Sequence, residues 1–224
     1  MSGRFITFEG GEGAGKSTQL RLLAEALRGA GFDVLATREP GGSPGAEDIR
    51  RLLVEGETGR WDAMTETLLH YAARRDHLVR TVWPALSAGR WVLSDRFADS
   101  TNAYQGRGHG LPAHAIEQLY QLVVGAFAPD LTLILDLPVE EGLGRAAGRG
   151  GAEDRYERMG LEFHRRLRQG FLEIAKAQPE RCVVISAAAP VAEVHAAVLH
   201  VVRERFGPFG AIEMQGARQP TQIL

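Results

Sequence analysis

The sequence contains a single cysteine, Cys182, so no disulfide bond can form within the chain. Cys182 lies in the apolar run Cys182–Ile185, where a small buried thiol is expected more often than a redox centre. We therefore interpret the cysteine as a structural residue.

The sequence also lacks a large net charge and a long apolar run. The 26 Lys and Arg residues nearly balance the 28 Asp and Glu residues, and the formal charge of −2 gives no overall positive field for nucleic acid or an anionic membrane. No segment approaches the roughly 20 apolar residues of a membrane span. The N-terminus lacks the basic-then-apolar pattern of a signal peptide. We expect a soluble, cytoplasmic protein that binds neither nucleic acid nor membrane.

The length and composition predict one domain. A chain of 224 residues with 44% hydrophobic residues can bury one substantial core. We predict a single domain over residues 1–206, with a glycine-rich loop near 148–154 that forms a mobile lid at about 146–156. Residues 207–224 contain scattered glycine and proline and are expected to form a loosely ordered tail.

Short apolar runs alternate with longer stretches of helical periodicity. This alternation predicts an α/β fold with a parallel sheet surrounded by helices. The expected strands are Phe5–Phe8, Val34–Thr37, Trp91–Ser94, Leu131–Leu137 and Cys182–Ser186. The expected helices are Ser17–Gly31, Thr65–Ser87 with an interruption near Pro84, Ala113–Phe127, Leu161–Ala177 and Ala192–Arg205.

The segment GGEGAGKS, from Gly10 to Ser17, matches the phosphate-binding pattern GxxxxGK[ST] between a strand and a helix. Backbone N–H groups and the helix N-terminus attract phosphate oxygens, Lys16 reaches the β- and γ-phosphates, and Ser17 offers its hydroxyl to Mg²⁺. The predicted ATP-binding residues are Gly10, Gly11, Glu12, Gly13, Ala14, Gly15, Lys16, Ser17 and Thr18.

Two further strands end in charged residues. Asp95 ends the third strand beside the expected position of a phosphate-bound Mg²⁺, so Asp95 and Ser17 are the predicted metal-binding residues. Arg96 follows directly, and Arg38 follows the second strand. Because the planar guanidinium binds phosphate well, two arginines at this edge suggest a second, acceptor phosphate.

Together these motifs resemble the thymidylate kinase family. The loop GGEGAGKST, TREPGG from Thr37, YAAR from Tyr71, DRF from Asp95 and STNAYQG from Ser100 occur in that family's order and spacing. The resemblance covers about Arg4 to Arg205. It implies a P-loop NTPase fold of the nucleoside monophosphate kinase type with a five-stranded parallel sheet, a homodimer, ATP with Mg²⁺ as donor, and dTMP as acceptor.

The resemblance also implies roles for individual residues. Arg38 and Arg96 would bind the dTMP phosphate and act in catalysis with Lys16, Glu12 would face the sugar hydroxyl, and Tyr104 would lie near C2′. Arg74 and Thr101 would bind the base, with Pro40 and Leu52 near its methyl group. His70 stands where the family has a phenylalanine, so its stacking on thymine is expected to be sensitive to pH. The predicted dTMP-binding residues are Glu12, Arg38, Pro40, Leu52, His70, Arg74, Arg96, Ser100, Thr101 and Tyr104.

The remaining catalytic duty is assigned to the lid. Gly13 occupies a P-loop position where one subclass of the family has an arginine, so Arg149 and Arg155 are the predicted catalytic lid arginines. A solvated basic loop is the alternative reading for this stretch. Likewise, Glu12 could be a solvated acid, and Arg74 could belong to an exposed charged helix face.

Three other functions stay open from the sequence. The first is another nucleoside monophosphate kinase with a different acceptor pocket, and the second is a nucleotide switch in which Arg38 and Arg96 are only ion-pair partners. The third is a motor acting on nucleic acid, which the balanced charge argues against.

Overall fold

Five short strands form one parallel sheet in the computed structural model, which describes residues 3–147 and 154–208. The strands follow the order β2-β3-β1-β4-β5, and each neighbouring pair is parallel. This confirms the predicted five-stranded parallel sheet. The strand bounds are β1 Phe5–Glu9, β2 Val34–Arg38, β3 Trp91–Asp95, β4 Leu131–Asp136 and β5 Cys182–Ser186.

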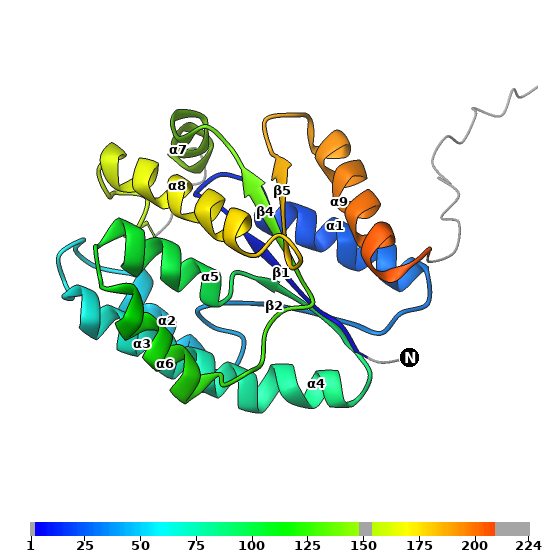
Figure 1. The fold of residues 1–224 in the computed structure, drawn as a ribbon, viewed down its shortest axis with the longest axis horizontal. Helices are drawn as coiled ribbons and strands as arrows, with labels where there is room; N and C mark the ends of the chain where they lie inside the picture. Colours follow the sequence, from blue (N-terminus) through cyan, green and yellow to red (C-terminus); the bar gives the residue numbers. More distant parts are fainter. Residues whose placement is uncertain (1–2, 148–153, 209–224) are drawn as a thin grey trace, which may run out of the picture.

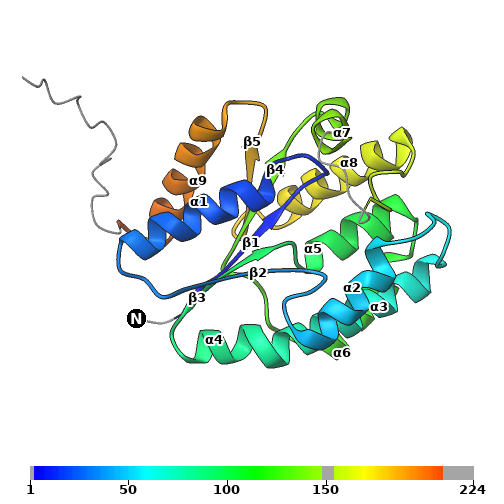
Figure 2. The same ribbon diagram turned by 180° about the vertical axis from the view of Figure 1, so that it is seen from behind.

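One face of the sheet is covered by α1 (Lys16–Gly29) and α9 (Val191–Phe206), which lie side by side in Figures 1 and 2. Apolar residues at helical spacing on α1 and α9 pack against the β1 side chains Ile6 and Phe8. The helix residues in this cluster are Leu20, Leu23, Leu27, Val194, Val198 and Val202.

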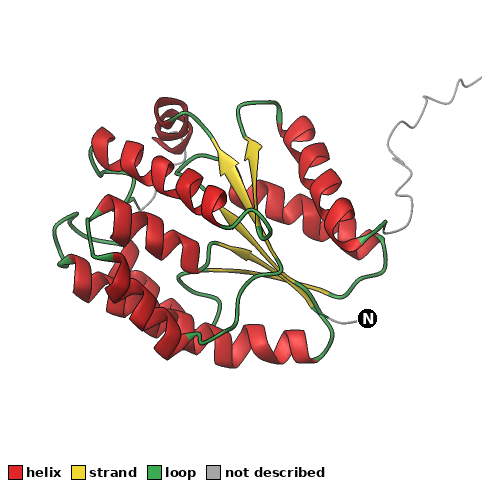
Figure 3. Ribbon diagram, in the orientation of Figure 1, coloured by secondary structure: helices red, strands yellow, loops and turns green. Residues whose placement is uncertain are grey.

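Other helices cover the opposite face, so the sheet is the middle layer of the molecule (Figure 3). Phe5 and Val92 of the sheet pack there with Tyr71, Phe97 and Ile116. The elements on this side are α3 (Ala63–His77), α4 (Trp83–Ser87), α6 (Ala113–Val123) and α8 (Leu161–Ala177).

The expected interruption near Pro84 takes a different form in the structure. The helical path continues from α3 through a π-helical turn, Leu78–Val82, into α4, and Pro84 is the second residue of α4. A proline is tolerated in the first turn of a helix because its missing N–H needs no intrahelical partner there.

Three helical segments were not predicted. They are α2 (Pro44–Val54), the short α5 (Ala98–Thr101) with its π-helical continuation Asn102–Gly108, and α7 (Val139–Ala147). Helix α2 buries only Ala46, Leu53 and Val54, and α7 is short and contains Gly142 and Gly144, which lower its helix propensity.

The described residues also bear on the predictions made for Cys182 and for membrane-spanning segments. Cys182 is a free, buried cysteine, and burial raises the pKa of its thiol to about 12. Within residues 3–147 and 154–208, no helix has both the length and the apolar character needed to cross a membrane. Residues 209–224 of the predicted tail and residues 148–153 of the predicted lid lie outside the described residues.

Candidate active site

The glycine-rich loop after β1 holds Lys16 in a buried position. The loop has left-handed or extended positive-φ backbone at Gly10, Gly13 and Gly15, which glycine adopts without strain. The Lys16 ammonium donates to the carbonyl oxygens of Gly11 at 2.8 Å and Gly10 at 3.2 Å. Burial and the nearby Arg96 lower the pKa of Lys16 to about 8. The loop therefore presents backbone N–H groups and a poised cation to an anion.

The loop opens into a cavity of about 600 Å³, which we call the phosphate cleft. The end of β2 contributes Arg38, and the end of β3 contributes Asp95 and Arg96. Arg38 and Asp95 are paired in the register of the parallel strands. The predicted residues Gly13, Gly15, Lys16, Ser17, Arg38, Asp95 and Arg96 all line this cleft, with Glu47 and Arg50 of α2.

Ser17 and Asp95 suit a magnesium ion by their chemistry. Both offer oxygen ligands to the phosphate cleft, and Mg²⁺ is usually held by one or two such groups together with substrate phosphates and water. Within the described parts of the chain there is no group of three or more His, Cys, Asp or Glu residues that could hold a metal alone. The donor set therefore fits a metal that arrives with a nucleotide.

Arg96 joins the glycine-rich loop to the chain after β3. Its backbone has φ of 72°, an unusual value for a residue with a side chain, and its backbone N–H donates to the Phe8 carbonyl at 2.9 Å. The guanidinium donates to Gly10 O at 3.0 Å and to Glu12 Oε1 at 2.9 Å. These contacts direct the side chain across the loop.

Glu12 is held as a carboxylate by its neighbours. Burial alone would raise its pKa, but the charges of Arg96 and Lys16 and the hydrogen bond from the Tyr104 hydroxyl, at 2.5 Å, lower it to about 2. Glu12 is therefore not a solvated loop acid, and it turns toward Tyr104.

Behind the cleft lies a smaller cavity of about 120 Å³, which we call the inner pocket. The two hollows share Glu12, Glu39, Arg50 and Arg96, so they meet at these residues. Of the predicted dTMP-binding residues, the inner pocket is lined by Glu12, Pro40, His70, Arg74, Arg96, Ser100, Thr101 and Tyr104.

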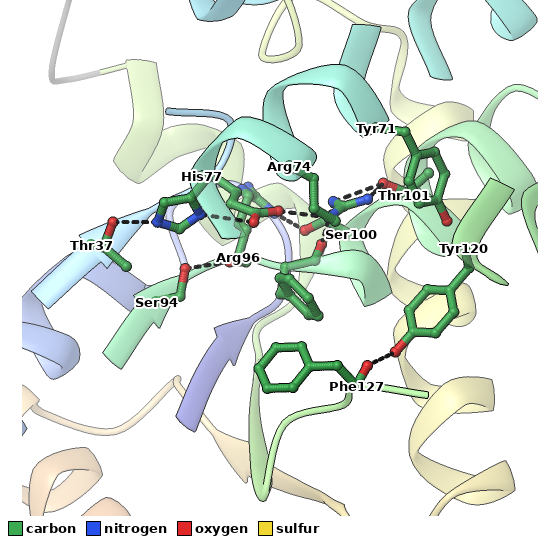
Figure 4. Close-up of polar contacts among 12 residues, drawn as sticks. Thr37, Tyr71, Arg74, His77, Ser94, Arg96, Ser100, Thr101, Tyr120 and Phe127 are labelled. Carbon is green, nitrogen blue, oxygen red and sulfur yellow. Dashed lines mark hydrogen bonds and ion pairs between the residues drawn. The ribbon is translucent and has the colours of Figure 1, made fainter. Parts of the chain in front are cut away.

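Polar contacts extend from Arg74 and Thr101, which line the inner pocket, to His77 and Thr37 behind it (Figure 4). Arg74 Nε donates to Glu39 at 2.8 Å, and the two Arg74 Nη atoms donate to the Thr101 hydroxyl oxygen at 3.1 Å. Since this oxygen accepts both bonds, the Thr101 proton must point away from Arg74. His77 Nδ1 donates to the Glu39 carboxylate at 3.0 Å, and His77 Nε2 lies 2.7 Å from the Thr37 hydroxyl oxygen. Arg74 is thus buried and not part of an exposed helix face.

His70 faces the inner pocket as a neutral ring. Burial lowers its pKa to about 4, and one ring nitrogen lies 2.9 Å from the Tyr156 hydroxyl. The imidazole is therefore already uncharged near neutral pH in this environment, so we expect no change in its charge there.

The sequence of this chain matches a known enzyme family over most of its length. A family model described as thymidylate kinase matches residues 8–198. This chain belongs to the thymidylate kinase family.

Individual relatives agree with this assignment. A thymidylate kinase of Caulobacter vibrioides is 60% identical over 205 residues, covering 92% of this chain and 98% of the relative. A thymidylate kinase of Dinoroseobacter shibae is 57% identical over 197 residues, covering 88% and 95%. The crystal structure of a thymidylate kinase from Ehrlichia chaffeensis is 38% identical, with a TM-score of 0.73, and covers 90% of this chain and 99% of that one.

Two residues that were predicted to bind dTMP or to act in catalysis do not line either hollow. Leu52 is on the exposed side of α2 and does not line the inner pocket, whereas Val54 does. Arg155 is fully buried and lines neither hollow, because its donors are bound to backbone carbonyls and to Glu66. The structure therefore gives Arg155 no place in the lining of either hollow, and the catalytic role predicted for it stays a prediction. Arg149 lies outside the described residues.

Several residues in or behind the two hollows were not predicted. Glu9, the last residue of β1, accepts from Phe97 N at 2.8 Å and Ser100 Oγ at 2.6 Å, and burial with nearby Asp99 raises its pKa to about 7. The sequence does contain a signal for Glu9, because a carboxylate directly before the P-loop must lie close to the bound phosphates or to the arginines around them. The inner pocket is further lined by residues that were not predicted as binding residues, namely Glu39, Arg50, Val54, Phe97, Gln105, Tyr156 and Glu157. Glu39 lies inside the TREPGG motif, and Arg50 required the prediction of α2.

Proposed function

We propose that this chain is a thymidylate kinase that transfers the γ-phosphoryl group of ATP to dTMP. The observation that carries the proposal is the junction of the two hollows. A cleft suited to phosphates opens at Arg96 and Glu12 into a pocket lined by the buried base-binding pair Arg74 and Thr101. This is the arrangement that two nucleotides need if their phosphates are to meet.

The donor phosphates occupy the P-loop. When ATP binds, the Lys16 ammonium leaves the carbonyl oxygens of Gly10 and Gly11 and donates to oxygens of the β- and γ-phosphates. The negative charge of these phosphates raises the pKa of Lys16 back toward its usual value, so the ammonium group stays protonated. Mg²⁺ held by Ser17 and Asp95 would neutralise charge on the β- and γ-phosphates.

The acceptor phosphate binds between Arg38 and Arg96. Arg50, which lies at the junction of the two hollows, adds a third positive charge beside them. One oxygen of the dTMP phosphate attacks the γ-phosphorus of ATP, and the bond to the β-γ bridging oxygen breaks, so ADP and dTDP leave. The protein contributes mainly position and charge.

The nucleoside occupies the inner pocket. Glu12 and Tyr104 contact the sugar, Arg74 and Thr101 bind the polar edge of thymine, and Pro40, Val54 and His70 enclose the ring. The Ser100 hydroxyl accepts from Arg96, which lines both hollows, and donates to the buried Glu9. Buried polar partners reject a base that leaves them unpaired more strongly than an apolar wall rejects one with a missing methyl group.

Arg149 is the proposed arginine that reaches the transferring phosphoryl group. The P-loop itself cannot supply it, because a Cβ on Gly13 would lie 2.0 Å from the Gly142 carbonyl oxygen. An arginine of this kind contributes about 10³- to 10⁵-fold in rate in related systems.

Replacing Arg38 tests the acceptor site. Arg38→Ala should lower dTMP-dependent ADP formation at subsaturating dTMP by about 10- to 100-fold, because charge-assisted bonds to phosphate are lost. ATP affinity, measured by calorimetry, should stay at the wild-type value. Arg51→Ala is the matched control, since Arg51 is exposed on α2 and pairs with Asp48. Wild-type turnover in Arg38→Ala would instead favour the switch without an acceptor.

We also propose that the enzyme is a homodimer. Helices α3 and α6 pack on each other, and both carry large apolar side chains that are exposed in the single chain. Leu68 on α3 is 49% exposed and Leu122 on α6 is 80% exposed. Such side chains on neighbouring helices are typical of a surface that a second copy covers.

A further inference from the structure

Arg155 and Glu66 form an ion pair in the interior, away from both hollows. The side chains are 0% and 1% exposed, and Arg155 Nη2 donates to Glu66 Oε2. Each side-chain nitrogen of Arg155 has a partner. Nε donates to Glu57 O at 3.1 Å, Nη1 to Leu53 O at 2.8 Å, and Nη2 also to Thr58 O at 3.2 Å. Arg155 therefore fixes the chain that leads out of α2.

Glu66 extends the same network to a third segment. Its other oxygen, Oε1, accepts from Gln105 Nε2 at 2.7 Å and lies 3.5 Å from His109 Nε2. Burial would raise the pKa of Glu66, but these neighbours and Arg155 lower it to about 2. A buried, ionised carboxylate is stable only when charged or hydrogen-bonding partners surround it, and Arg155 is the positively charged partner of Glu66.

All three segments tied by the pair also supply walls of the inner pocket. Val54 ends α2, Gln105 lies in the π-helical segment after α5, and Tyr156 follows Arg155. The Arg155 guanidinium lies over the Tyr156 ring at 5.2 Å. Tyr156 in turn meets His70 through its hydroxyl and packs edge-on against Tyr104 at 5.3 Å between ring centroids.

We propose that Arg155 and Glu66 are a positioning pair that assembles the wall of the inner pocket formed by Val54, Gln105 and Tyr156, and so sets the affinity for the nucleoside part of dTMP. This inference rests on the proposed function, which places dTMP in the inner pocket. Arg155 acts through Tyr156 and its neighbours and makes no contact with the transferring phosphate.

A positioning role and a transition-state role leave different kinetic signatures. A catalytic arginine stabilises charge that develops during transfer, so its loss lowers kcat. A residue that shapes the nucleoside wall affects dTMP binding, so its loss raises the KM for dTMP while the KM for ATP stays constant.

The test uses the full-length enzyme with Arg155→Lys, which keeps a cation beside Glu66 but replaces three donor nitrogens with one. We expect the KM for dTMP and its dissociation constant to rise about 10-fold, with kcat within about 3-fold of wild type. Arg165→Lys is the matched control, because Arg165 on α8 is exposed and pairs with Glu140 and Glu162. It should leave all constants unchanged.

A double-mutant cycle separates positioning from general loss of stability. Because Arg155 acts through Tyr156, the effects of Arg155→Lys and Tyr156→Phe on dTMP affinity should not add. The double variant should bind dTMP with nearly the same affinity as whichever single variant binds it less tightly. If Arg155→Lys does not fold, Glu66→Gln is the substitute, and it should show the same selective rise in KM for dTMP.

Two results would overturn the inference. One is a fall of about 100-fold or more in kcat with an unchanged KM for dTMP, which would make Arg155 part of the chemical step. The other is a folded variant with wild-type dTMP affinity and only a lower melting temperature. Failure of the wild type itself to bind dTMP would refute the proposed function and is measured separately.

Discussion

At the scale of single residues, Arg38 and Arg74 of the proposed acceptor site are each paired with a carboxylate of the protein. Arg38 pairs with Glu47 at 2.9 Å, where both side chains are more than a third exposed, so the pair is weak and readily exchanged for a phosphate. Arg74 pairs with Glu39 in the interior, where an unpaired charge would cost several kcal/mol. We infer that Arg38 is available to substrate phosphate, whereas Arg74 is a fixed part of the pocket.

His70 gives a prediction for pH dependence. Its pKa of about 4 lies below the usual value of about 6.5, so the ring is neutral from about pH 5.5 to 8. The ratio of kcat/KM for dTMP between wild type and His70→Phe should stay constant within about 2-fold over this range, because the titration of the dTMP phosphate affects both enzymes equally.

The same pKa predicts how stability changes with acid. Because the folded state favours the neutral imidazole, its contribution is present above about pH 6.5 and is lost as the pH falls toward 4. Wild type should therefore lose more stability than His70→Phe in denaturant titrations at these two pH values.

The activity prediction has its own contradicting outcome. If the ratio of kcat/KM for dTMP between wild type and His70→Phe changes sharply near pH 6.5, His70 titrates in the active site.

At the scale of elements, the P-loop and α7 touch backbone to backbone. A Cβ on Gly142 would lie 2.4 Å from the Glu12 carbonyl oxygen, and a Cβ on Gly13 would lie 2.0 Å from the Gly142 carbonyl oxygen. Helix α7 therefore supports the position of the phosphate-binding loop from behind.

This contact predicts opposite outcomes for two glycines of one helix. Gly142→Ala must displace the P-loop or α7, and a shift of about 1 Å near the reacting groups can lower kcat/KM for ATP about 100-fold. Gly144→Ala is the control, because nothing lies within 4 Å of its Cβ. It should leave activity intact and stabilise the helix by roughly 0.5–1 kcal/mol in denaturant titrations. Equal activity of the two variants would contradict the account.

At the same scale, the sequence predicted the residues that depend on strand order and missed those that depend on helix orientation. Lys16, Arg38 and Asp95 meet because parallel strands end at one edge of a sheet, a rule that needs only the strand bounds. Leu52 and Arg155 were misplaced because their direction depends on how α2 and the segment after the lid pack. Sequence periodicity does not fix such packing when a helix, such as α2, buries few residues.

At the scale of the whole molecule, the five-stranded sheet presents the cleft at one edge, while α3 and α6 present apolar side chains elsewhere. A variant carrying both Leu68→Glu and Leu122→Glu should be monomeric by light scattering at concentrations where the wild type is a dimer. Leu161→Glu, on α8 and 39% exposed, is the control and should stay dimeric. A monomeric wild type would refute the homodimer.

The identity of the acceptor is the central claim, and a coupled ADP assay with a panel of nucleoside monophosphates tests it most directly. With ATP and Mg²⁺ present, dTMP should give the highest kcat/KM, dUMP should be a poorer acceptor, and AMP, UMP and CMP should give little ADP above background. Phosphorylation of AMP, UMP or CMP without phosphorylation of dTMP would contradict the account.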